Sequence, residues 1–126
     1  MILYLKTADE LCQIWLDEQK FTWPAGRELS KGLLRFLQQS LENQRQTWSD
    51  VTAIVVFRGP GSYTSLRIGL TVANTLADSL QIPIVGAEGD DWRQTALNRI
   101  TQNPTASDGI VTPIYTQDVF ITKPRK

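Results

Sequence analysis

The segment RGPGSYTSLRIGL, residues 58–70, carries the residue types in this chain that are best suited to chemistry. It follows an apolar run and opens an amphipathic stretch. Gly59 and Gly61 can adopt backbone conformations closed to residues with a Cβ, and Ser62 or Thr64 can cap a helix. Unpaired N–H groups at such a helix start attract anions, phosphate above all. The segment therefore predicts either an anion site or a plain strand-to-helix turn.

The composition removes several common kinds of catalytic and metal site. The 126 residues include no histidine and one cysteine, Cys12. Without histidine there is no Ser-His-Asp triad, and the commonest metal ligand is absent. One cysteine cannot form an internal disulfide or a structural zinc set. The adjacent carboxylates Asp90 and Asp91 fit a solvated helix start. We therefore expect no catalytic residue, no metal and no cofactor.

The charge balance bears on partners and location. Thirteen basic residues match thirteen acidic ones, and the formal net charge is zero. Dedicated nucleic-acid binders usually carry a basic surface, so that class is disfavoured. Lys123, Arg125 and Lys126 form a small basic cluster that fits a solvated end. The sequence shows neither a signal peptide nor a long apolar span, so we expect a cytoplasmic protein without membrane contact.

Hydrophobic periodicity predicts the elements that position residues 58–70. The chain has the length of one ordinary domain. In chain order we expect strands at 1–5, 10–16 and 20–23, a helix at Arg27–Arg45, a strand at Val51–Phe57, a helix at Thr64–Leu80, a strand at Ile84–Ala87, a helix at Asp91–Ile100, and a last strand or extended arm at Ile110–Tyr115. Three antiparallel strands followed by a β-α-β-α-β order predict a mixed α/β sheet.

Both longer predicted helices carry more apolar surface than one core-facing side needs. Leucines recur every four residues in the first helix, and the face that carries Ile68 and Val72 in the second lies off its core side. Contiguous exposed apolar residues usually mark a partner surface. We expect partner contacts at Leu29, Leu33, Phe36 and Leu37 of the first helix and at Ile68, Val72 and Thr75 of the second. An ordinary core role fits the leucines equally well, whereas Ile68 and Val72 fit an interface better.

The whole segment 58–70 resembles the signature of the bacterial TsaB family, also called YeaZ, which reads close to GRGPGSFTGLRIG. Here Phe57 replaces the first glycine of that signature, Tyr63 replaces phenylalanine and Ser65 replaces glycine. The likeness continues in TVANTLADSLQIPIVGA at residues 71–87, which is similar to the family's helix and its "IPLVGV" strand. In total it covers residues 1 to about 90.

The resemblance implies the actin/Hsp70/sugar-kinase (ribonuclease H-like) fold. Residues 1–100 correspond to a single lobe of the N-terminal type, and residues 101–126 form a short tail or extended arm. The family is typically two-lobed and far longer, so the interlobe cleft that holds nucleotide in related folds should be missing. The first strand usually ends in "DTS", whereas this chain has Lys6-Thr7-Ala8, and the histidine common in the first helix is absent. Each departure moves away from catalysis.

The resemblance also implies a function. TsaB proteins help make threonylcarbamoyl-adenosine in tRNA as partners of TsaD, the homologous subunit that carries the metal and the transfer chemistry, and the ATPase TsaE joins both. TsaB and TsaD pair through two helices of their N-terminal lobes. We therefore expect a non-catalytic scaffold that pairs with TsaD, meets tRNA only indirectly and forms a homodimer when alone.

Two alternatives stay open. The first is a small nucleotide- or anion-binding module that uses the turn formed by Gly59, Gly61, Ser62 and Thr64. The second is an enzyme, because related families were once classed as glycoproteases. The sequence offers no nucleophile–base pair for that reading.

Overall fold

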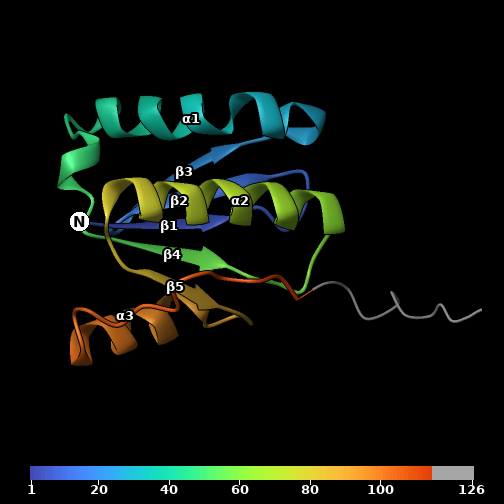
Figure 1. Ribbon diagram of the computed structural model, residues 1–126. Coiled ribbons are helices and arrows are strands. Elements are labelled where there is room, and N and C mark those ends of the chain that lie inside the picture. The colour runs from blue at the N-terminus through green and yellow to red at the C-terminus, as the bar shows by residue number, and fades with distance from the viewer. Residues whose placement is uncertain (115–126) are drawn as a thin grey trace, which may run out of the picture.

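A five-stranded mixed sheet forms the centre of the computed structural model, which describes residues 1–114 (Figure 1). The strand order is β3-β2-β1-β4-β5. The strands are β1 (Ile2–Lys6), β2 (Cys12–Leu16), β3 (Gln19–Trp23), β4 (Ala53–Phe57) and β5 (Ile84–Ala87). The helices are α1 (Leu29–Asn43), α2 (Tyr63–Leu80) and α3 (Trp92–Gln102), with short 3-10 turns η1 (Gly26–Glu28) and η2 (Trp48–Asp50). The predicted order and type of these elements are confirmed.

Pairing within the sheet follows from the connections. β1 pairs antiparallel with β2, and β2 pairs antiparallel with β3, because short turns join them. β4 pairs parallel with both β1 and β5, and α2 forms the crossover between β4 and β5. The first helix is shorter than predicted at both ends; at its start, the predicted residues Arg27 and Glu28 belong to η1 instead.

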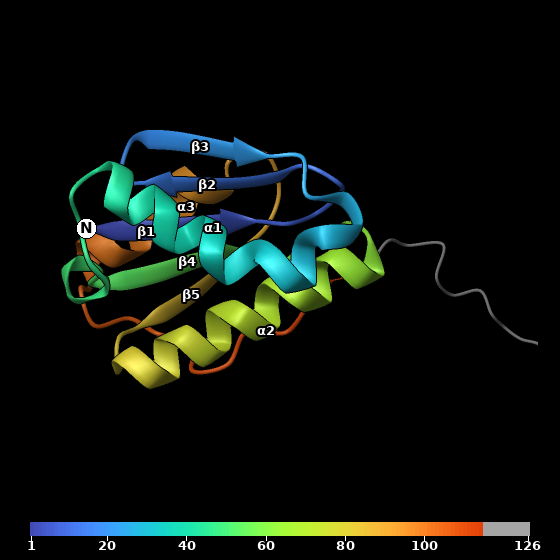
Figure 2. The same ribbon diagram turned by 90° about the horizontal axis from the view of Figure 1, so that it is seen from above.

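Helices cover both faces of the sheet. α1 and α2 lie together on one face and α3 lies on the other (Figures 1 and 2). All five residues of β4 are buried as a result, which explains its continuous apolar sequence. On the α3 side, Trp92 packs edge-on against the rings of Tyr4, Trp15 and Phe57. Within residues 1–114, no helix is long and apolar enough to cross a bilayer.

The glycines of the turn between β4 and α2 allow backbone segments to pack closely. Gly59 has a φ of +128°, and a Cβ there would collide with the backbone carbonyl of Ile114. At Gly61 a Cβ would lie 2.9 Å from both the Cβ and the carbonyl oxygen of Ala8. The amide of Ser62 donates to that same carbonyl at 2.8 Å. Packing therefore accounts for both glycines.

Residues 107–114, here called the strap, close the outer edge of β5. The Asp108 amide donates to the Ile84 carbonyl at 2.7 Å, and the Gly86 amide donates to the Asp108 carboxylate at 2.7 Å. The Ile84 amide donates to the Ser107 hydroxyl at 3.2 Å. Side-chain oxygens thus accept from amides that would otherwise be open to another strand.

The second half of the strap is held by α2 and by the residue that follows β4. The Asn74 side chain donates to the Val111 carbonyl at 3.0 Å and accepts from the Val111 amide at 2.9 Å. The Arg58 side chain donates through Nε to the Thr112 carbonyl at 2.9 Å, and the Arg58 backbone carbonyl accepts from the Ile114 amide at 2.6 Å. The strap is therefore anchored along its length to the lobe.

The strap occupies most of the segment for which a last strand or extended arm was expected. Residues 110–114 form no strand, and they run as a docked extended segment. Tyr115 and the basic cluster Lys123, Arg125 and Lys126 lie outside the described residues. The division into a lobe at 1–100 and a tail at 101–126 stays a prediction, although α3 continues to Gln102.

Candidate interaction surface

The solvent-facing sides of α1 and α2 form one continuous surface, which we call the helix-pair surface. The two helices lie side by side on the sheet (Figure 2). A groove of about 330 Å³ lies between the first turn of α1 and the first half of α2, and it is lined largely by apolar groups. Residues that define the surface are Ser30 and Leu34 of α1 with Tyr63, Arg67, Ile68 and Val72 of α2.

Apolar side chains are accessible along this surface. Leu34 is 53% exposed and Tyr63 is 56% exposed, although both are large hydrophobic residues. Ile68 and Val72 are half-buried, since they pack against the core while lining the groove. Thr75 is exposed on α2. The structure therefore places the three predicted α2 residues off the core face; whether they bind a partner stays a prediction.

The expectation that Leu29, Leu33 and Leu37 lie on an outward face is wrong. They are 3%, 0% and 1% exposed, because this row of leucines is the side of α1 that covers the sheet. Phe36 is half-buried, but its ring lies 5.4 Å from that of Trp23 in β3, on the side of α1 away from the α2 groove. The leucines serve the core, and Phe36 packs at the β3 edge.

Sequence reasoning left three residues out of the surface: Leu34, Tyr63 and Arg67. Leu34 directly follows a core leucine, and a step of one residue rotates the side chain by about 100° around the helix. Tyr63 and Arg67 flank the first buried residue of α2, Leu66. A helical wheel could have shown this, because Tyr63 lies three residues before Leu66 and Arg67 one residue after it, and both positions fall beside the core side of the helix.

The predicted side-chain cap of α2 is also wrong. Ser62 occupies the N-cap position, but its side chain makes no capping hydrogen bond. Its carbonyl accepts from the Leu66 amide at 2.9 Å, which is the first bond of the helix. Thr64 is exposed within the first turn and lines the groove. The proximity of Gly59 and Gly61 to neighbouring backbone explains the turn without a ligand.

At the end of β1 this chain has Lys6 where the family's first strand usually has an aspartate, and Lys6 and the following Thr7 both make structural contacts. The Lys6 ammonium lies 4.6 Å from the centroid of the Phe57 ring. The buried Thr7 donates through its hydroxyl to the Ser65 carbonyl at 2.8 Å and lies directly against Gly69. Thr7 thus ties β1 to α2. Among residues 1–114, no group of three or more His, Cys, Asp or Glu side chains could hold a metal ion.

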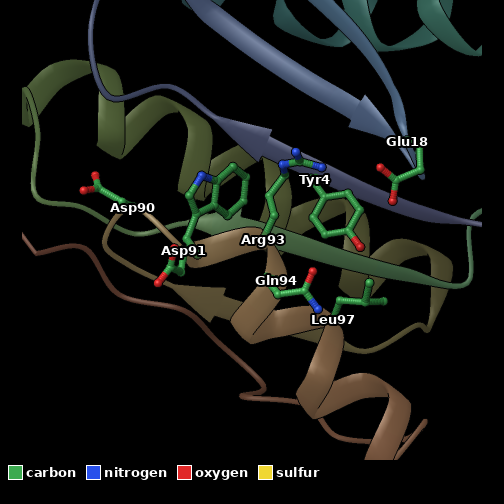
Figure 3. Close-up of a pocket in the computed structure, with 8 residues that line it drawn as sticks. Tyr4, Glu18, Asp90, Asp91, Arg93, Gln94 and Leu97 are labelled. Atoms are coloured by element: carbon green, nitrogen blue, oxygen red, sulfur yellow. The ribbon is translucent and has the colours of Figure 1, made fainter.

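A pocket of about 210 Å³ lies on the opposite face of the sheet, beside α3 (Figure 3). The Arg93 guanidinium crosses it, 4.3 Å from the Trp15 ring centroid and 5.6 Å from that of Tyr4. Burial, reinforced by the nearby Asp17 carboxylate, raises the pKa of Tyr4. Glu18 lines the same pocket. Arg93 therefore acts here as a cationic cover for aromatic rings that α3 does not shield.

Comparison with known proteins places the helix pair in a defined family. A family model described as TsaD, tRNA N6-adenosine threonylcarbamoyltransferase, matches residues 24–89, a segment that contains both α1 and α2. The chain is 44% identical over 66 residues to the tRNA threonylcarbamoyladenosine biosynthesis protein TsaB of Bacillus subtilis, covering 52% of this chain and 26% of that protein. It is 30% identical over 116 residues to the TsaB of Escherichia coli, covering 79% and 47%. The chain therefore spans less than half the length of either relative.

A solved structure agrees with the sequence relatives. YeaZ from Pseudomonas aeruginosa matches with a TM-score of 0.58 at 28% identity, over 69% of this chain and 44% of that one. Together with the mixed sheet, this likeness confirms the predicted fold, an α/β lobe of the actin/Hsp70/sugar-kinase type. The chain belongs to the TsaB (YeaZ) family, within the wider family that the TsaD model describes.

Proposed function

We propose that this chain acts in the biosynthesis of threonylcarbamoyladenosine in tRNA as a non-catalytic scaffold, which pairs with a TsaD protein through the helix-pair surface. The observation that carries the proposal is the family match at residues 24–89, which contains both helices of that surface. The relatives from B. subtilis and E. coli both carry the TsaB name and that biosynthetic role in their descriptions.

The shape of the helix-pair surface supports docking of another helical element. Ile68 and Val72 line the groove together with the exposed Tyr63, and Leu34 is exposed on α1 one turn after Ser30, which lines the groove too. Removal of apolar surface from water is the main favourable term in protein association. Interfaces obtain most of their binding energy from a few residues near the centre, surrounded by a polar rim. Val72 and Ile68 are the half-buried apolar residues that line this groove, and the exposed polar residues Thr64, Arg67 and Thr71 line it beside them.

The residues that could act as nucleophiles have structural roles instead, which supports the scaffold role. Cys12 is buried, and burial raises its thiol pKa to about 12, so the thiolate that a nucleophile requires does not form near neutral pH. Lys6 lies over the Phe57 ring. In this proposal TsaD supplies the transfer chemistry, TsaE completes the complex, and tRNA is met only through TsaD. The purified chain alone should hydrolyse no ATP and modify no tRNA.

Co-purification with the TsaD protein of the same organism tests the pairing. Val72→Asp places a charge in the apolar groove of the surface, so it should weaken TsaD binding by several kcal/mol, on the order of a hundredfold or more. Thr95→Asp, an exposed position on α3 at the opposite face, is the matched control and should bind as the unaltered chain does. Circular dichroism and urea unfolding verify that both variants fold.

Two results would contradict the scaffold role. One is a TsaD protein that binds neither the unaltered chain nor the Thr95→Asp control in a reconstituted mixture with TsaE. The other is turnover of ATP or tRNA by the isolated chain that survives repeated purification and disappears on changing one residue.

A further inference from the structure

The outer edge of β3 is open, whereas the strap closes the opposite edge of the sheet at β5. Within residues 1–114, no segment hydrogen-bonds to the outer edge of β3. A two-residue turn joins β2 to β3, so Leu16 and Gln19 form a hydrogen-bonded pair. Because such pairs alternate along an antiparallel ladder, the exposed residues Lys20 and Thr22 direct their N–H and C=O groups away from the sheet. β3 therefore offers unpaired backbone groups to an added strand.

A hollow of about 560 Å³, which we call the β3-edge hollow, lies between β3 and α1. Trp23 is half-buried, and its indole lies against α1 at Gly32, where a Cβ would collide with it. The Phe36 ring lies 5.4 Å from the Trp23 ring, and together the two rings form the apolar part of the hollow. Residues that line the hollow include Trp23, Glu28, Lys31, Gly32, Arg35 and Phe36.

Lys31 and Arg35 make the β3-edge hollow basic. They lie four residues apart on α1, so they share one side of the helix and are separated by about 6 Å along its axis. Both are exposed, and neither forms an ion pair within the part of the chain that the structure describes. Glu28 is the carboxylate that lines the hollow beside them, so cations are in excess. The charge of the hollow therefore suits an acidic partner.

We propose that an extended acidic segment of another protein adds to β3 as a further strand and places alternate side chains in the β3-edge hollow. In this mode of recognition, main-chain hydrogen bonds provide affinity and pockets for alternate side chains provide specificity. Residues two apart on a strand share a face and lie about 6.7 Å from each other. That spacing is close to the separation of Lys31 and Arg35, and α1 runs back beside β3 (Figure 2). Carboxylates at alternate positions can therefore meet both cations.

The same observations disfavour other occupants of this edge. β3 carries Lys20 and no acidic residue, so pairing with the β3 strand of a second copy would bring together positive charges only. The outward backbone groups of β3 match a peptide main chain, which a phosphate backbone cannot reproduce. The hollow lies on the side of α1 away from the groove of the helix-pair surface. The proposal is therefore independent of the proposed TsaD pairing.

Titration of the chain with a synthetic peptide tests the proposal. The probe is a short peptide in which valine alternates with glutamate, with one tyrosine in place of a central glutamate, and fluorescence anisotropy follows its binding. The dissociation constant should be about 1 mM or tighter and should rise with salt, which screens exposed charges. The same peptide with lysine in place of glutamate should bind about tenfold more weakly or worse. A glutamate peptide that is N-methylated at alternate amides cannot pair with β3 and should not bind.

Charge reversal and hydrogen exchange locate the site. The double variant Lys31→Glu and Arg35→Glu should weaken binding of the glutamate peptide about tenfold or more and should tighten binding of the lysine peptide. Arg45→Glu makes the same charge change beyond the end of α1 and outside the hollow, so this matched control should bind as the unaltered chain does. The amides of Lys20 and Thr22 should exchange more slowly in the complex. Circular dichroism verifies that each variant folds.

Four results would overturn the proposal. The glutamate peptide could fail to bind at about 1 mM. It could bind the folded double variant as tightly as the unaltered chain, or bind without slowing exchange at Lys20 and Thr22. A single-stranded oligonucleotide could displace the peptide and bind more tightly, which would make nucleic acid the occupant. The chain alone could self-associate with protection of the same two amides, which would make a second copy the occupant.

Discussion

Replacing Asn74 by alanine should detach the strap from α2. The Asn74 amide makes two hydrogen bonds to the backbone of Val111, one as donor at 3.0 Å and one as acceptor at 2.9 Å. It therefore pairs with Val111 as a neighbouring strand would. Val111 is 5% exposed, and its side chain sits directly against Gly86 of β5. Loss of the amide leaves the Val111 N–H and C=O without their protein partners in a site with little access to water.

The size of the effect follows from these two bonds. A hydrogen bond contributes roughly 0.5–1.5 kcal/mol net, and leaving a buried group unsatisfied costs about 1–3 kcal/mol. Alanine's higher helix propensity returns up to about 0.7 kcal/mol. The free energy of unfolding should therefore fall by about 2 kcal/mol. Thr75→Ala, at the next helix position, which is exposed, should change it by less than about 0.5 kcal/mol.

Urea unfolding measures the free-energy difference, and amide hydrogen exchange locates it. The Val111 amide should lose protection in Asn74→Ala and keep it in Thr75→Ala. If Asn74→Ala were as stable as the control, and the Val111 amide exchanged as slowly as before, the strap would not depend on the Asn74 amide and the reasoning would fail.

Two further predictions concern the glycine turn and the buried thiol. Gly59→Ala adds a Cβ against the Ile114 carbonyl at a φ of +128°, so it should destabilise the fold by more than the roughly 1–3 kcal/mol of backbone strain alone, as measured by urea unfolding. Its control is Gly26→Ala, at positive φ but in open space, which should cost about 1 kcal/mol in the same measurement. Cys12 has a folded-state pKa of about 12, against an ordinary 9.0, because of burial. The stability that comes from keeping this thiol protonated is therefore intact below pH 9 and is lost as the pH rises towards 12. When the free energy of unfolding is measured at pH 8 and again above pH 10, Cys12→Ala should not show this pH-dependent loss.

Much of the fold could be predicted because its signals are local. The continuous apolar run of β4 indicates a strand covered on both faces, and the structure buries all five of its residues. The spacing of Leu66, Leu70, Ala73 and Ala77 predicts the core side of α2, and all four are buried. The signature at residues 58–70 predicts the family, which the comparisons confirm. Each of these signals needs only neighbouring residues.

The side of α1 that faces outward could not be predicted in the same way. Periodicity shows that the leucine row shares a face, but it does not say whether a sheet or a partner covers that face. The structure puts Leu33 at 0% exposure against the lobe's own sheet and leaves Leu34 exposed. Phe36 packs on Trp23, a contact across the β3 edge that neither residue's local sequence encodes. Burial here depends on which elements the topology brings together.

Sequence by itself determined the order of the elements, the glycine-rich turn and the family. Tertiary structure decided why the turn contains glycine and what closes the sheet. Gly59 is needed because the backbone of Ile114 passes against it, 55 residues later in the chain. Asn74 pairs with Val111 across 37 residues, and the Asp108 side chain accepts from the Gly86 amide across 22. Contacts between residues so far apart leave no periodic pattern in the sequence, because only the folded chain brings their atoms together.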